Sequence, residues 1–234
     1  MATGMDSQFG IKTEVAYGTG VTVDEFIPIL GESMSREEDF TESEGIISGN
    51  RLIESDQWNS GNLTFSGSIE SELYTINMRT LFEHMFGGVA GAGPWTFTPA
   101  TLQDLSFTMQ VGKPAIDAVH PFTYAGCKIT SWEIALAAGE IATFGFDVVA
   151  QSEAVTTPTL ATVSYPAIIK PYKFTHGTVE YNNSAINVKQ ITISSDNMLN
   201  TDRRYIGTQT IAEPIEDDRR SFSGSMTMDF EDFA

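Results

Sequence analysis

Residues 131–150 read Ser-Trp132-Glu-Ile134-Ala-Leu136-Ala-Ala-Gly139-Glu-Ile-Ala-Thr-Phe144-Gly-Phe146-Asp-Val148-Val-Ala150, and this stretch decides the fold. On both sides of its centre, apolar residues alternate with polar or small ones, which is the period of a strand with one buried face. The central Ala-Ala-Gly-Glu is placed to turn the chain back on itself. The stretch therefore predicts a β-hairpin, with Trp132 in the core beside Ile134 and Leu136.

The same alternation recurs along most of the chain. It is strict from Leu105 to Val111, clear from Asn62 to Ile69, and visible near the C-terminus at Phe222, Met226, Met228 and Phe230. Between Ile186 and Ile193 the parity slips by one residue across Lys189-Gln190, which predicts a β-bulge. The sequence thus favours a mainly β, antiparallel fold.

One segment has helical spacing instead. Apolar residues at Leu73, Ile76, Leu81, Phe82, Met85 and Phe86 share one face, so we expect an amphipathic helix over about residues 71–86. Gly87-Gly88 would end it. The glycine-rich residues 87–93 follow a helix rather than open one, so they are interpreted as a flexible connector and not as a phosphate-binding loop.

Composition excludes several classes of function. The 234 residues carry 31 acids and 13 bases, a formal net charge of −18. Proteins that grip nucleic acid or anionic membranes need clustered Lys and Arg, so neither tight DNA binding nor membrane binding is expected. The single Cys127 excludes an internal disulfide framework and is typical of a protein made in a reducing compartment.

No catalytic or metal-binding pattern stands out. His84, His120 and His176 lack close-spaced ligands, and Cys127 lies on an expected strand, where a small buried hydrophobe is the ordinary interpretation. No Gly-x-Ser-x-Gly elbow is present. We therefore expect no enzyme, no cofactor and no metal site.

An acidic stretch with little apolar periodicity runs from Glu32 to Glu44, and we interpret residues 32–50 as a long solvated loop. Its candidate functional residues are Glu32, Arg36, Glu37, Glu38, Asp39, Phe40, Glu42 and Glu44.

The two halves of the chain echo each other. Phe65-Ser-Gly-Ser68 recurs as Phe222-Ser-Gly-Ser225, and the segment before each also matches, Ile27–Met34 with Ile191–Met198. Ordered matches of this kind indicate an internal duplication. We expect a first module over residues 1–155, a linker over 156–171, and a second, incomplete module over 172–234. Whether the native chain extends beyond Ala234 stays open.

The order of these features resembles the major tail tube proteins of long-tailed bacteriophages. The resemblance lies in Thr13–Thr19 with Phe26–Ile29, the long loop, Gly61–Gly67, the helix ending Leu81–Gly87, Trp95–Pro99, and then residues 105–111, 124–128 and 132–150.

The resemblance implies an antiparallel β-sandwich or barrel with one flanking helix. It implies subunits that close into rings of six, or of three if each chain contributes two modules, with inner strands pairing between neighbours. It also implies that the rings stack into a hollow tube, that the long acidic loop joins one ring to the next, and that an acidic lumen conducts DNA. Implied partners are further copies, the tape-measure protein, and tail terminator and distal tail proteins. The implied location is the virion, after synthesis in the host cytoplasm.

Two other hypotheses remain. Trp58 and Trp95 would suit a carbohydrate- or receptor-binding β-sandwich of a virion or cell surface. An enzyme built from paired carboxylates is the third, and no motif in the sequence favours it.

Overall fold

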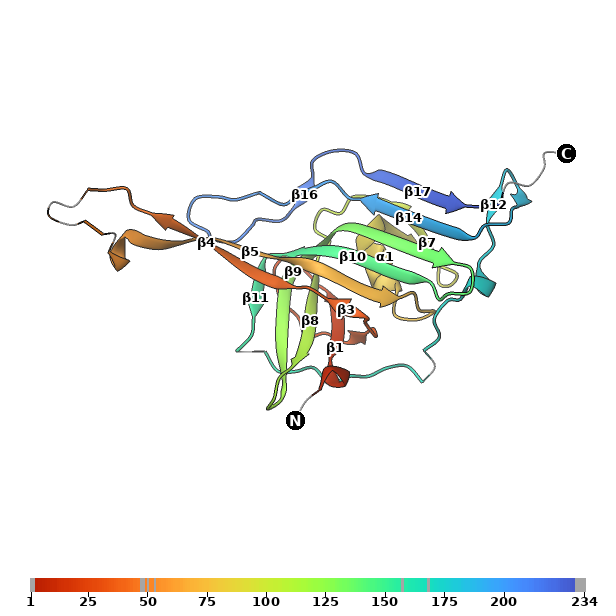
Figure 1. The fold of residues 1–234 in the computed structure, drawn as a ribbon, viewed down its shortest axis with the longest axis horizontal. Helices are drawn as coiled ribbons and strands as arrows, with labels where there is room; N and C mark the ends of the chain where they lie inside the picture. The colour runs from red at the N-terminus through yellow and green to blue at the C-terminus, as the bar shows by residue number, and fades with distance from the viewer. Residues whose placement is uncertain are drawn as a thin grey trace.

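The alternating stretches form strands of one eleven-stranded, antiparallel hydrogen-bonded sheet in the computed structural model, which describes residues 3–46, 49, 51–52, 54–156, 158–167 and 169–229 (Figure 1). This confirms the mainly β, antiparallel fold with one flanking helix that the sequence predicts. Phe230, the last residue of the predicted C-terminal alternation, and residues 47, 48 and 50 of the predicted loop lie outside the described residues.

Strand β9 (Val119–Ala137) belongs to both halves of the sheet. Its first part pairs with β8 (Phe107–Pro114) and β11 (Ser152–Ala154), and its second part pairs with β10 (Thr143–Ala150) and β14 (Gln190–Asp196). Figure 1 shows the strands around the first part running vertically and those around the second part running horizontally. The direction changes near Gly126, whose φ of 68° suits glycine.

Each half is completed by further strands. We call the half that contains β8 and β11 the lower half and the half that contains β10 and β14 the upper half. The lower half continues from β8 to β1 (Gln8–Thr13) and β2 (Glu25–Phe26). The upper half continues from β10 to β5 (Trp58–Glu72), which pairs with β3 (Gly31–Glu32) and β4 (Ser35–Glu42), and from β14 to β17 (Ser221–Thr227). The remaining elements are η1 (Gly4–Asp6), η2 (Ser55–Gln57), α1 (Arg79–Phe86), β6 (Gly87–Ala90), β7 (Thr96–Pro99), η3 (Phe174–His176), β12 (Glu180–Tyr181), β13 (Ser184–Ala185), β15 (Leu199–Asn200) and β16 (Ile215–Glu216).

The core lies between the two halves and under α1. Its largest fully buried side chains include Phe9, Phe107, Tyr124 and Phe144. The predicted hairpin around Gly139 joins β9 to β10, and Trp132 is buried as predicted. Strand β8 is buried on both faces rather than one, because Thr108 and Gln110 are also covered.

The helix is shorter than the sequence predicts. Residues 71 and 72 stay in the ladder between β5 and β10, and Leu73 continues in extended form, its N–H donating to the carbonyl of Ala142 at 2.8 Å. The helical spacing of Leu73 and Ile76 is therefore incidental, and α1 spans only eight residues. It ends as predicted, with Gly87 in the left-handed region at φ 91°.

Two other local predictions are wrong. The glycine-rich residues 87–93 are not a plain connector, since β6 forms a hairpin with β7. No bulge lies at Lys189-Gln190: β14 begins at Gln190, and Ile186 instead donates to the carbonyl of Val179 at 2.9 Å. The parity slip in the sequence marks the start of a strand.

The expected second module joins the sheet of the first. Strand β14 pairs with β9 on one side and β17 on the other, while residues 159–161 run beside β8, held by Gln8 and Gln110. The duplication and its boundaries stay a prediction.

A buried ion pair fastens the segment before β16 to the sheet. The Lys128 side chain is 2% exposed and donates to Glu213, to the carbonyl of Leu102 at 2.7 Å and to that of Pro214 at 3.1 Å. Burial lowers the pKa of Lys128 from its ordinary value, and the adjacent Glu213 opposes that shift.

We expect Glu213→Gln to lower the free energy of unfolding by about 3 kcal/mol, because the substitution leaves a buried ammonium without its carboxylate. Urea unfolding followed by circular dichroism measures the change. The matched control, Lys128→Met with Glu213→Leu, removes both charges and should recover most of the loss. Wild-type stability in Glu213→Gln would contradict the role of this pair.

A close backbone contact occurs at Gly67, where a Cβ would lie 2.6 Å from the Cα of Met34. Gly67→Ala should therefore destabilise the fold by about 1–3 kcal/mol, as overpacking does elsewhere. The control is Gly145→Ala in the neighbouring strand, whose Cβ would meet nothing nearer than 3.8 Å. Equal urea midpoints for the two variants would show that the close approach of β5 to Met34 does not need glycine.

Candidate assembly surfaces

The outward face of the upper half is polar and acidic. Across β5, β10, β9, β14 and β17, the strand registers place residues in rows that run from strand to strand. The first row is Ser68, Asp147, Ser131, Asp196 and Ser221. The second is Glu70, Gly145, Glu133, Ser194 and Ser223, and the third is Glu72, Thr143, Ala135, Thr192 and Ser225.

We call these fifteen positions the seryl-acid face. They hold five carboxylates and no Lys, Arg, His or Cys. Because strand residues alternate in direction, the same strands send their apolar side chains to the other side, where those of β5, β9 and β10 enter the core. The alternation that predicts the strands thus also produces this face.

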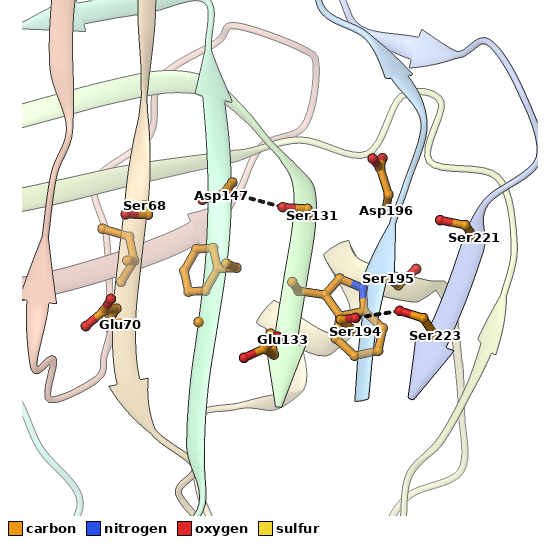
Figure 2. A pocket seen from close by; sticks show the side chains of 14 residues that line it. Ser68, Glu70, Ser131, Glu133, Asp147, Ser194, Ser195, Asp196, Ser221 and Ser223 are labelled. Atoms are coloured by element: carbon orange, nitrogen blue, oxygen red, sulfur yellow. Dashed lines mark hydrogen bonds between the residues drawn. The ribbon is translucent and has the colours of Figure 1, made fainter. Parts of the chain in front are cut away.

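The first two rows line a shallow depression of about 500 Å³ (Figure 2). In Figure 2 the labelled side chains are serines, aspartates and glutamates, and they come from five neighbouring strands. Ser131 donates to Asp147 at 2.5 Å, and the hydroxyls of Ser194 and Ser223 lie 2.8 Å apart. At its fifteen positions the face offers hydroxyls and carboxylates and no cationic side chain, which makes it a hydrated, negatively charged surface.

The predicted acidic loop is instead a β-hairpin. Strand β4 pairs with the first part of β5, and this hairpin projects from the body at one end of the long axis (Figure 1). We call the described residues between 35 and 60 the arm. The prediction of a loop is wrong because residues 35–42 find backbone partners in β5 even though most of their side chains are exposed. A strand that is exposed on both faces needs no alternation of apolar and polar residues, so its sequence does not reveal it.

The arm brings several of the predicted residues together. Arg36 lies 2.8 Å from Glu38, which also accepts a hydrogen bond from Ser60. These hydrogen bonds, that of Ser60 first, lower the pKa of Glu38. Phe40 packs edge-on against Trp58, with ring centroids 6.3 Å apart.

The other predicted residues do not share that cluster. Glu37, Asp39, Glu42 and Glu44 are exposed on or beside the arm. Glu32 belongs to the body, in β3, where it lies 3.1 Å from Lys113 of β8.

Sequence reasoning missed a segment that supports the base of the arm. Arg204 donates to the carbonyl of Leu63 at 3.1 Å and to the Thr64 hydroxyl at 2.8 Å, and Leu63 donates to the carbonyl of Gln209 at 2.9 Å. These partners are about 140 residues apart in the chain. No local pattern would have revealed the contact.

Strand β17 is an edge of the upper half, paired only with β14 among the described strands. An apolar strip runs along β14 and β17 and the residue just after β17, and four of its side chains are 44–49% exposed. An unpaired strand with apolar side chains is an aggregation template unless another chain covers it. The apolar strip comprises Ile193, Phe222, Met226 and Met228.

The cysteine, histidine and tryptophan residues considered as candidates for catalysis or ligand binding pack against other parts of the chain. Cys127 is buried, which raises its thiol pKa, and burial lowers the pKa of His84 to about 3. Trp58 packs on Phe40 in the arm, whereas Trp95 lies under Arg79 beside β7, so the structure gives them separate partners rather than a common platform.

Within the described ranges, no group of three or more potential ligands is placed to hold a metal ion. No helix among those residues combines the length and the apolar character needed to cross a bilayer.

Two of the solved structures that resemble this chain are distant from it in sequence. A chain of the anti-feeding prophage baseplate shares 14% identity over 64% of this chain and 91% of its own, with a TM-score of 0.40. A type six secretion system protein shares 12% identity over 79% of this chain and 93% of its own, with a TM-score of 0.36. A comparison with curated proteins found no match.

The family comparison is far more extensive. A family model described as "Phage tail tube protein" matches residues 4–234, nearly the whole chain. The match agrees with the antiparallel β-structure, the single described α-helix and the resemblance carried by the sequence. The chain belongs to the phage tail tube protein family, and is therefore a structural component of a bacteriophage tail.

Proposed function

We propose that copies of this chain close into rings, that the rings stack into a hollow tail tube, and that the seryl-acid face lines the lumen through which DNA passes. The observation that carries the proposal is the composition of that face: five carboxylates and no cation at fifteen positions on five adjacent strands.

Charge explains why such a face suits a conduit. DNA binds proteins largely through Lys and Arg, which neutralise phosphates and release counterions. A wall without cations gives DNA no such contacts, and its carboxylates repel phosphate. The genome then moves along a hydrated surface without being held. This is the opposite of what a DNA-binding protein requires.

The edges of the upper half explain why copies would associate. At one side lies β17 with the apolar strip, and at the other lies β3, paired with the part of β5 that belongs to the body. A contact between two different edges is heterologous, and repeating it around an axis closes a ring when a whole number of copies completes one turn. Ring closure would pair exposed backbone groups and remove the apolar strip from water.

The finer assignments follow from the family. Six copies per ring, or three if each chain supplies two modules, both fit a closed ring. The tape-measure protein would occupy the lumen before DNA, and terminator and distal tail proteins would bind the two ends of the tube. Synthesis in the host cytoplasm would precede incorporation into the virion. The chain would act as a structural protein without catalysis.

Met226→Glu should abolish ring formation while leaving the subunit folded, because Met226 is 48% exposed in the apolar strip and a charge there resists burial against a neighbour. Analytical ultracentrifugation and negative-stain electron microscopy measure assembly, and circular dichroism checks the fold.

The matched control is Ser225→Glu, which adds the same charge to the next residue of β17 on the seryl-acid face. It should still assemble, since that face already carries carboxylates. Normal rings from Met226→Glu, or equal failure of both variants, would contradict the proposed ring contact.

A further inference from the structure

The two ends of the long axis carry opposite chemistry. The arm projects at one end, and the segment containing η3 and β12 lies at the other (Figure 1). We call residues 170–189 the basic end. Because these surfaces lie at opposite ends of the molecule, they cannot meet within one copy.

The arm is acidic and displays aromatic side chains. Residues 35–60 hold seven acids and two arginines. Phe40 is 63% exposed and Trp58 is 47% exposed, and their edge-to-face pair leaves both rings partly in water. Glu37 and Asp39 are exposed and form no ion pair within the described part of the chain.

The basic end is the complement. Residues 170–189 hold three lysines and a single acid, Glu180, in a chain whose net charge is −18. Neither Lys170 nor Lys173 has an ion-pair partner among the residues that the structure describes, whereas Lys189 pairs with exposed Asp229 at 2.5 Å. Glu140, in the β9–β10 turn, adds one more acid beside η3, its carbonyl accepting from Phe174 at 3.1 Å.

Aromatic side chains are exposed here too. Tyr172 is 41%, Phe174 45% and Tyr181 71% exposed, and Tyr172 packs edge-on against His176 at 6.2 Å. Aromatic side chains are enriched in the cores of protein interfaces, and the exposed lysines beside them suit the polar rim that surrounds such a core.

We propose that the arm of one copy docks on the basic end of a second copy, so that Phe40 and Trp58 contact Tyr172, Phe174 and Tyr181 while Glu37 and Asp39 lie opposite Lys170 and Lys173. The occupant is a second copy because the charges and the aromatic surfaces match. Copies with a net charge of −18 repel each other unless a local contact offsets that repulsion.

This inference rests on the proposed assembly into stacked rings and adds the receiving surface. A contact between opposite ends of a molecule is heterologous, and when it is repeated without rotation it extends along one direction. The long axis of the subunit would therefore run along the tube, and the arm would join one ring to the next. Since the charges are exposed, the contact should weaken as salt rises.

Charge exchange tests the contact. Lys170→Glu with Lys173→Glu, and separately Glu37→Lys with Asp39→Lys, should each lower the fraction of protein that sediments as tubes at least several-fold. All four side chains are exposed, so the subunits should remain folded and the rings should still form. Combining both pairs in one chain should restore stacking, because the charges again match. Negative-stain microscopy distinguishes single rings from stacks.

A further variant controls for total charge. Lys170→Glu and Lys173→Glu combined with Asp6→Lys and Asp117→Lys has the wild-type net charge but leaves the arm acidic, so it should not stack. Normal tubes from either charge-reversed pair, or no recovery in the combined variant, would overturn the docking contact while rings persist. A wild-type chain that forms neither rings nor tubes would overturn the proposed function as well.

Discussion

The continuous backbone ladder of β9 is the constraint on which the rest of the structure depends. Its 19 residues pair with β8 and β11 at one end and with β10 and β14 at the other, so a single strand sets the register of both halves of the sheet. Because side chains alternate along it, Trp132 enters the core while Ser131 and Glu133 face outward. The same ladder therefore builds the interior and the seryl-acid face, and one cannot be shifted without the other.

Much of this was predictable from local pattern. The hairpin around Gly139, the strand over residues 105–111 and the burial of Trp132 all follow from alternation of period two. Two of the errors come from backbone pairing that the local side-chain pattern does not reveal. Residues 71 and 72 are held in a strand by β10 despite helical spacing nearby, and the acidic residues 35–42 become β4 because β5 supplies backbone partners. Neither partner is visible in the local sequence.

The candidate surfaces, too, were only partly predictable from the sequence. The sequence indicated the acidic stretch and the overall acidity, but not which carboxylates share a face, because that depends on registers among five strands. It placed Glu32 with the arm, whereas Lys113 ties that residue to the body. No pattern in the sequence indicated that Arg204 and Gln209 support the arm. Both contacts involve backbone groups of Leu63, and every residue type supplies such groups.

The central claim is that the cation-free face of the upper half lines the lumen. A cryo-electron microscopy reconstruction of the assembled tube tests it most directly. The account predicts that Glu133, Asp147 and Asp196 point into the central channel, with β17 of each copy paired to its neighbour in the ring. A channel lined instead by the lower half of the sheet, or a seryl-acid face buried between copies, would contradict it.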